Sequence, residues 1–461
     1  MLDDGILGAI IKKTLSNGGE YADVFIEHKK TTALQLEDNR IEKVVSGSIS
    51  GIGVRLIYKG KTAYAYSNDF SEDVLINLAD TVSKAASGSA QGVIIDMKRK
   101  LPEITFSIKM PPETVPMAEK VALVKKGNES ARKFDSSIKQ VNVIYRDSVQ
   151  NVKIATSDGF ITEDERVYTM GAVQVVASDG KVIQTGYESV GGLIGYELFG
   201  AGPIDTVALK AAQRAVMMLK SKRAPAGRMP VIISSEAGGT MIHEAIGHGL
   251  EADLTQQGLS VFSGKIGQQV ASPVITVIDD ATIPNKRGSF RFDDEGTPSK
   301  RNVLVKNGIL VGYMYDKYTA LLEGSLSTGN GRRESFECKP IPRMTNTLIV
   351  PGELSPEEVI RSVPRGLLVK KMGGGQVNTV TGDFVFEVQE GYIIENGSIV
   401  EPVRGATLIG SGPEILKSID MVASDLGFSI GTCGKDSQGV PVSDAMPTLR
   451  IPEMVVGGEV R

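Results

Sequence analysis

The sequence has no tryptophan, only two cysteines and three histidines, and aromatic residues make up 5% of its 461 residues. Two cysteines, Cys338 and Cys433, cannot form the disulfide framework of a small secreted protein. No apolar run approaches the roughly 20 residues that cross a bilayer, and the chain opens on the acidic Met1–Asp4, where a secretion signal would be basic. These absences predict a soluble cytoplasmic protein with no membrane segment.

The charge of the chain is nearly balanced, with 51 Lys and Arg against 55 Asp and Glu. No long basic run supplies the electrostatic footprint that nucleic-acid binding requires, so DNA or RNA is not expected as a direct partner. A hydrophobic content of 41% can form a large core in two or three domains. The 52 glycines favour turns and short strands over a helical bundle.

The first 220 residues alternate between helical and strand-like patterns. Helices are predicted at residues 6–15, 71–86, 117–134 and 205–219, the last with Asp205 as its N-cap. Alternating apolar residues around Asp38-Asn39 and Lys59-Gly60 predict antiparallel hairpins. A second β block at residues 138–196 turns at Ser157-Asp158-Gly159 and Ser178-Asp179-Gly180, which is typical of a meander.

The segment from Ser221 to Gly227 is a plausible domain boundary, and the sequence beyond it is rich in glycine and valine. One predicted helix, near residues 236–250, interrupts these short strands. We therefore predict the α+β fold class. An N-terminal α/β domain of antiparallel hairpins and helices would span residues 1–220, and a β-rich C-terminal catalytic domain that carries the metal-site helix would span residues 221–461.

His243 and His248 lie in one short motif, with Glu244 between them. Zinc proteases often place two histidines four residues apart on one helix face, with a glutamate between them as general base. Here the spacing is five, which turns the two side chains about 140° apart on a regular α-helix. A π-bulge or an unwound turn beside Gly247 would bring both imidazoles to one side. Without that break, the pair is explained equally well as surface histidines on a frayed helix end.

A catalytic zinc site needs a third protein ligand. The remaining histidine, His28, lies among charged residues in a predicted strand, where we expect it to be solvated. Cys433 is the better candidate, because a thiolate is a strong zinc donor and flanking residues such as Gly434 allow close approach of a metal. Nearby Lys435 is expected to lower the pKa of this thiol from roughly 8.5. A lone cysteine without the histidine pair would more simply be an inert buried residue.

At these motifs the sequence resembles the TldD/PmbA family of metalloproteases, and specifically its TldD-type catalytic branch. The resemblance begins with His-Glu-Ala-Ile-Gly-His-Gly-Leu-Glu-Ala-Asp at residues 243–253. It continues in the segments at residues 293–298, 312–318, 329–335, 342–347, 382–384, 404–410 and 433–435. These motifs cover most of the chain from residue 229 onward, whereas residues 1–220 agree in layout more than in any sharp motif.

The resemblance implies that His243, His248 and Cys433 bind Zn²⁺ and that Glu244 activates the metal-bound water. The non-catalytic branch of the family lacks the His-Glu-x-x-x-His element, so its presence here indicates a protease. The resemblance also implies a homodimer, or a heterodimer with a PmbA-type (TldE-type) subunit, around a β-lined chamber. The expected substrates are peptides or unfolded polypeptides.

The expected function is therefore that of a zinc-dependent metallopeptidase that hydrolyses unfolded or extended peptides, with Glu244 as general base. One alternative is a non-proteolytic, peptide-binding regulatory protein with a structural zinc, for which a closed site of four ligands is expected. Another is a zinc amidohydrolase acting on small acyl substrates, because this water chemistry is not specific to peptides. Three good donors plus Glu244 favour an open catalytic site over a closed one.

Overall fold

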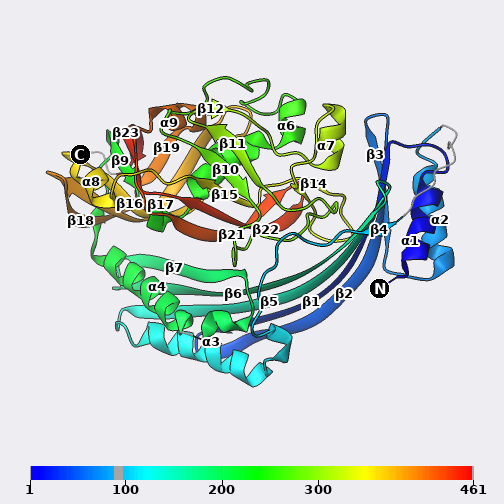
Figure 1. Cartoon of the computed structure of the whole chain (residues 1–461). Helices are drawn as coiled ribbons and strands as arrows, with labels where there is room; N and C mark the ends of the chain where they lie inside the picture. Colours follow the sequence, from blue (N-terminus) through cyan, green and yellow to red (C-terminus); the bar gives the residue numbers. More distant parts are fainter. Residues whose placement is uncertain (1, 88–96, 201, 459–461) are drawn as a thin grey trace.

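The computed structural model describes residues 2–87, 97–200 and 202–458. A long curved sheet from the N-terminal half of the chain holds the C-terminal half on its concave side, and two pairs of helices cover its outer side (Figure 1). Helices and sheets mix in both halves, and the predicted α+β class is confirmed. No described helix is long and apolar enough to cross a membrane.

The N-terminal half contains long strands, which Figure 1 shows running side by side below the C-terminal half. Its helices are α1 (Asp4–Thr14), α2 (Glu72–Ser83), α3 (Met117–Arg132) and α4 (Pro203–Lys220), with short 3₁₀ turns η1 (Pro112–Thr114) and η2 (Tyr196–Phe199). Its strands are β1 (Tyr21–Glu37), β2 (Arg40–Tyr58), β3 (Lys61–Ser67), β4 (Lys98–Arg99), β5 (Ile138–Thr156), β6 (Phe160–Ser178) and β7 (Ile183–Leu193).

The order of this sheet is β3-β2-β1-β5-β6, with β7 and the short β4 both paired to β6. The predicted hairpins β1–β2 and β2–β3 and the predicted meander β5–β6–β7 are all present. Asp38 and Asn39 adopt positive φ at the first turn, a conformation that these residue types tolerate.

One predicted helix start is wrong. Gly202 is the N-cap of α4 and Pro203 is its first residue, whereas Asp205 lies inside the first turn. The Asp205 carboxylate accepts a hydrogen bond from Ser130 and pairs with Lys126, both on α3. It therefore ties two helices together, and Pro203, with its fixed φ, supplies the helix start.

Two apolar clusters hold the helices on the sheet. Leu7, Ile10 and Ile11 of α1 share one helix face at 0–1% exposure and pack with α2 against β1 and β2. The other cluster joins α3 and α4 to β5, β6 and β7. A Cβ at Gly186 of β7 would lie 2.0 Å from the carbonyl oxygen of Ala211, so the α4 backbone approaches this strand more closely than a larger residue would allow.

The C-terminal half contains many short strands and a few short helices. Its strands are β8 (Lys222–Arg223), β9 (Gly227–Ile233), β10 (Val277–Asp280), β11 (Arg301–Lys306), β12 (Ile309–Leu310), β13 (Gly331–Arg332), β14 (Ile341–Pro342), β15 (Asn346–Ile349), β16 (Arg365–Val377), β17 (Asp383–Glu395), β18 (Ser398–Arg404), β19 (Thr407–Ser411), β20 (Met421–Val422), β21 (Gly427–Lys435), β22 (Gln438–Met446) and β23 (Leu449–Gly457). Its helices are α5 (Thr240–Ile242), α6 (Ala252–Gln256), α7 (Lys317–Leu322), α8 (Pro356–Arg361) and α9 (Gly412–Ser418), and the short turns η3 (Ser235–Ala237), η4 (His243–Gly247) and η5 (His248–Leu250) lie before and after α5.

Two large sheets and the two-stranded sheet β13–β14 form the C-terminal half, and the two large sheets share one apolar core. In the larger sheet the order β16-β9-β23-β19-β17 closes into a ring, because β17 also pairs with β16. The smaller sheet has the order β12-β11-β10-β15-β22-β21, so β21 is its edge strand. The segment from α5 to η5 contributes Met241, Ile242, Ile246 and Leu250 to the shared core at 0–1% exposure.

Two buried arginines of the N-terminal sheet bind acidic residues of the C-terminal half and so join the two halves. Arg55 of β2 lies 2.7 Å from Glu295, and Arg166 of β6 lies 2.6 Å from Asp294. All four side chains are at least nine-tenths buried. Because losing one partner would strand a buried charge, these pairs fix the concave face of the sheet against the C-terminal half.

Candidate metal centre

A broken helix carries both histidines of the candidate site. After α5, the turn η4 over His243–Gly247 has π-helical hydrogen bonding, and η5 over His248–Leu250 is a 3₁₀ turn. The wider π turn changes the angle between side chains five residues apart. The two imidazole rings lie 4.9 Å apart between centroids and are nearly perpendicular, at 88°. The break that the motif requires is therefore present, and the frayed-end interpretation does not apply, since His243 is 6% exposed.

Gly247 contributes to this break because its lack of a side chain leaves room for the core, and not because of a special backbone conformation. Its φ of −53° is ordinary for a right-handed helix, so the turn needs no glycine for its backbone conformation. A Cβ at this position would lie 2.1 Å from the Sδ atom of Met344, which is fully buried. A side chain at residue 247 would therefore have to displace Met344 within the core.

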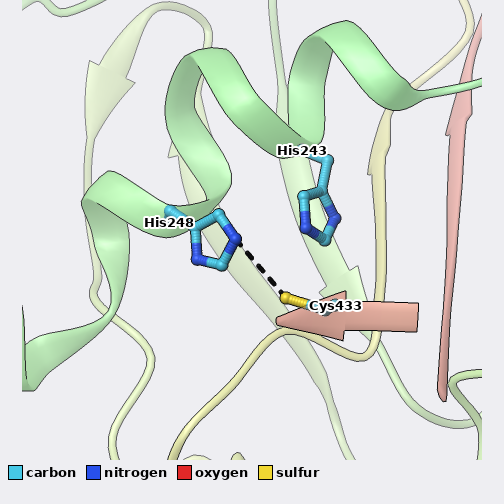
Figure 2. A group of neighbouring side chains, drawn as sticks. All are labelled: His243, His248 and Cys433. Atoms are coloured by element: carbon cyan, nitrogen blue, oxygen red, sulfur yellow. Dashed lines mark hydrogen bonds between the residues drawn. The ribbon is translucent and has the colours of Figure 1, made fainter. Parts of the chain in front are cut away.

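Cys433 reaches the histidines from β21 and lies 185 residues beyond His248 in the chain. Figure 2 shows its thiol facing the two imidazoles, with the His248 Nε2 atom 3.4 Å from Sγ. The possible ligand atoms of His243, His248 and Cys433 all lie within 4.8 Å of one another, and this is the one such group found among the described residues. The spacing is compatible with three ligands of a single ion.

Each imidazole is oriented by a carboxylate on its far side. The Nδ1 atom of His243 lies 2.7 Å from Asp444 Oδ1, and the Nδ1 atom of His248 lies 3.0 Å from Glu251 Oε2. Lys435 in turn donates to Glu251 and to Asp253, at 3.0 and 2.7 Å. Carboxylates that hold Nδ1–H leave Nε2 available as a metal donor, which is the usual arrangement behind histidine ligands.

The two imidazoles favour ionisation of the Cys433 thiol. Burial opposes the thiolate, but hydrogen bonds and charge interactions with His243 and His248 prevail and lower the pKa of Cys433 to about 6. Lys435 is not among the main causes of this shift, and its ammonium is bound by Glu251 and Asp253. In turn, Glu251 and Cys433 outweigh burial and raise the pKa of His248 to about 10.

Glu244 lines an open cleft of about 520 Å³ together with the three candidate ligands. It is half-buried, and within residues 2–87, 97–200 and 202–458 no hydrogen bond holds its carboxylate. Gln376, Val377 and Thr379 lie on the same cleft. An unrestrained carboxylate beside the candidate ligands is free to exchange a proton with a bound molecule.

Three family models match successive parts of the chain. The models describe PmbA/TldA metallopeptidase domain 1 at residues 22–88, the central domain at residues 111–219 and the C-terminal domain at residues 226–458. The chain belongs to the PmbA/TldD metallopeptidase family. The C-terminal model alone covers about half of the chain and contains the whole candidate metal centre.

Relatives in this family are similar over nearly their whole length. A metalloprotease TldD homolog from Haemophilus influenzae is 39% identical over 95% of this chain and 93% of its own. A metalloprotease from Methanocaldococcus jannaschii is 38% identical over 94% of this chain and 96% of its own. A relative from Saccharolobus solfataricus, 28% identical over 98% of this chain and 99% of its own, is named a zinc metalloprotease TldD homolog.

Solved structures agree in fold at lower identity. TldE from Thermococcus kodakarensis superposes with a TM-score of 0.79 at 19% identity, over 98% of this chain and 100% of its own. A Thermotoga maritima protein, named for a suggested role in modulating DNA gyrase, gives 0.82 at 22% identity over the same shares. At these identities the likeness shows the family fold.

The structure also places the residues left outside the site. His28 is half-buried on β1 and is hydrogen-bonded to Ser50, and Cys338 is a free, partly exposed thiol. Asp444 was not identified from the sequence. It lies 201 residues from His243, and no local pattern marks an aspartate on a strand as the partner of a distant imidazole.

Proposed function

We propose that this chain is a zinc-dependent metallopeptidase, with His243, His248 and Cys433 as zinc ligands and Glu244 as general base. The observation that carries the proposal is the convergence of two imidazoles and one buried thiol within 4.8 Å. This donor set suits zinc, which binds nitrogen and thiolate ligands. The name of the Saccharolobus relative agrees with this metal.

The surroundings of the three donors fit a zinc ion. A ligand thiol must be ionised, and the Cys433 pKa of about 6 provides the thiolate at neutral pH. Asp444 and Glu251 hold the Nδ1 sides of the imidazoles and direct Nε2 toward the thiol. Three protein donors beside an open cleft are typical of a catalytic zinc site, whereas structural sites use four.

When bound, zinc supplies a Lewis acid that lowers the pKa of water and polarises a scissile carbonyl. The Glu244 carboxylate accepts the proton of the attacking water and delivers it to the leaving amine nitrogen. The carboxylates of Asp444 and Glu251 keep both imidazoles in the required tautomer.

The edge position of β21 favours extended peptides as substrates. In the described part of the chain, β21 pairs with β22 along one side and ends its sheet on the other. A peptide added as a further strand along this edge would pass Cys433 with its main chain extended. Packed proteins cannot present such a strand, so unfolded polypeptides are the proposed substrates.

We further propose that the chain acts as a dimer, either of two copies or with a PmbA-type (TldE-type) subunit. The likeness of its fold to TldE supports this proposal, since the two chains share one architecture over nearly their full lengths. Light scattering of the purified chain, alone and mixed with such a subunit, tests it. A monomer under both conditions would contradict it.

The replacement Glu244→Gln tests the proposed reaction. We expect the variant to keep its zinc and to hydrolyse an unstructured peptide about 10²–10⁴-fold more slowly. Glu357→Gln, an exposed glutamate on α8, is the control and should match the wild type. Loss of zinc together with activity would show that Glu244 is a ligand or a structural support.

The substrate class is tested with the wild-type protein. Cleavage of the peptide but not of N-acylated small amides supports the peptidase. The reverse preference would indicate an amidohydrolase, and tight peptide binding without any cleavage would indicate a regulatory binding protein.

A further inference from the structure

A second cavity, of about 160 Å³, lies between the concave face of the N-terminal sheet and the β21–β22 hairpin. We call it the arginine pocket, because most of its charged lining residues are basic. Its basic lining residues are Lys29, Arg166, Arg287, Arg332 and Arg333, and its acidic ones are Asp294 and Glu334. Thr432 lines both this pocket and the metal cleft.

The two carboxylates of the arginine pocket already have partners. Asp294 pairs with Arg166 at 2.6 Å through one oxygen and accepts the backbone N–H of Arg333 at 2.8 Å through the other. Glu334 accepts the backbone N–H of Gly439 at 2.7 Å. Neither carboxylate is hydrogen-bonded to Arg287 or Arg332.

The guanidinium groups of Arg287 and Arg332 donate only to backbone carbonyls in the described part of the chain. Arg332 binds the carbonyl oxygens of Met344 and Pro441 at 2.6 and 2.7 Å, and Arg287 binds that of Gly431 at 3.2 Å. Neither forms an ion pair with a carboxylate among the described residues. Arg332 is 4% exposed, so its charge is taken out of water without a carboxylate bonded directly to it.

The pKa shifts separate Arg287 and Arg332, which have no carboxylate partner within the described residues, from Arg166, which has one. Burial lowers the pKa of Arg332 and that of Arg287. Burial acts on Arg166 as well, yet the charges of Asp294 and Asp164 prevail and raise its pKa. The arginine pocket therefore has an excess of positive charge that its own carboxylates do not neutralise.

Size and position indicate what would neutralise this charge. A volume of 160 Å³ corresponds to about five water molecules, which suits a carboxylate on a short stem but not a nucleotide. Thr432 and Cys433 are neighbours on β21, and successive side chains of a strand point to opposite faces. A peptide paired along this edge would direct alternate side chains toward the metal cleft and toward the Thr432 face.

We propose that the arginine pocket binds a carboxylate of the peptide substrate, from an Asp or Glu side chain or from the C-terminus, close to the scissile bond. The identity of the ligand rests on the proposed peptidase function, whereas the anion preference of the pocket does not. Arg287 is the residue to test, because it is half-buried and sits on a loop between β10 and β11.

Binding of three matched fluorescent peptides to full-length protein tests the proposal. The reference peptide has a neutral unstructured sequence and a C-terminal amide. The second peptide has Glu in place of one Gln, and the third has a free C-terminal carboxylate. In the Glu244→Gln background, which limits turnover, we expect one of the acidic peptides to bind at least about tenfold more tightly than the neutral one. Which of the two binds more tightly identifies the source of the carboxylate.

Arg287→Gln should abolish this preference, so that the acidic and neutral peptides bind alike. Arg291→Gln is the matched control, because Arg291 lies on the same loop, is equally half-buried and is paired with Asp164. If Arg287→Gln does not fold, Lys29→Gln on β1 is tested in its place. It should likewise weaken the preference for the acidic peptide. Equal binding of the three peptides, or an unchanged preference in the folded variant, would overturn the proposal.

Two further readouts separate the remaining outcomes. Inorganic phosphate that binds with dependence on Arg287 while all peptides bind equally would assign the pocket to a free anion and overturn its assignment to substrate. Hydrolysis by the wild type is measured independently. Cleavage without a carboxylate preference defeats the pocket proposal alone, and preference without cleavage defeats the peptidase proposal alone.

Discussion

The Nε2 atom of His248 lies 3.4 Å from the Sγ atom of Cys433, and two independent parts of the fold create this contact. The π turn over His243–Gly247 orients the histidine. The pairing of β21 with β22 places Cys433 opposite Val440 and directs its side chain toward the turn. Mutations on either side are therefore expected to disrupt the same site.

The two cysteines should respond differently to replacement. Cys433→Ser removes a soft anionic donor, and we expect zinc binding to weaken strongly. Cys338→Ser should retain wild-type zinc content, because Cys338 lies outside the ligand cluster. Thiol labelling gives a second readout, in which zinc protects Cys433 and chelation exposes it. Protection of Cys338 instead would contradict the ligand assignment.

Asp444→Asn should lower zinc affinity about 10–100-fold, because the amide no longer supports His243 as the carboxylate does. Competition with a chromophoric chelator measures the affinity. Asp253→Asn is the control, since Asp253 is bound by Lys435 and contacts neither histidine. Equal effects of the two replacements would mean that general loss of charge near the site, and not orientation of His243, is responsible.

Gly247→Ala should destabilise the site helix, because the added Cβ would meet Met344 Sδ at 2.1 Å. Overpacking of a core commonly costs about 1–3 kcal/mol, which thermal unfolding detects as a lower midpoint. Gly434→Ala, whose Cβ has no neighbour within 4 Å, should match the wild type. Gly247→Ala combined with Met344→Ala should cost less than the sum of the two single replacements, and strictly additive effects would contradict the contact.

The local features of the site were predictable, as was Cys433 as the third ligand candidate, whereas Asp444 and the contacts of Lys435 were not. A histidine spacing of five is incompatible with one face of a regular α-helix, so the motif itself required the break that η4 provides. The hairpins followed from alternating residues and turn chemistry. Asp444 depends instead on the pairing of β22 with β15 and β21, and Lys435 on contacts with a helix more than 180 residues away. Local sequence patterns do not encode such contacts.

Stability should fall as pH rises through the range in which Glu295 ionises. Burial, together with Asp316 and Asp293, outweighs Arg55 and raises its pKa from 4.5 to about 8. Because the folded state binds this proton more tightly than the unfolded state, the contribution of Glu295 to stability is lost between about pH 4.5 and 8. Glu295→Gln should flatten the decline of the unfolding midpoint over this range.

The exposed Glu353→Gln is the control for loss of one carboxylate from the chain. It should leave the pH profile of the midpoint parallel to that of the wild type. A Glu295→Gln profile that also runs parallel to the wild type would mean that Glu295 does not take up a proton on folding.

Zinc content of the purified protein, measured by mass spectrometry of the metal, tests the metal centre most directly. We expect one zinc ion per wild-type chain, the same content in His28→Ala, and loss of zinc in His243→Ala. Both replacements remove an imidazole, but only His243 lies in the ligand cluster. His28 lies on the N-terminal sheet, where it is hydrogen-bonded to Ser50. Full zinc content in a folded His243→Ala variant would contradict the assignment of His243, His248 and Cys433 as the metal site.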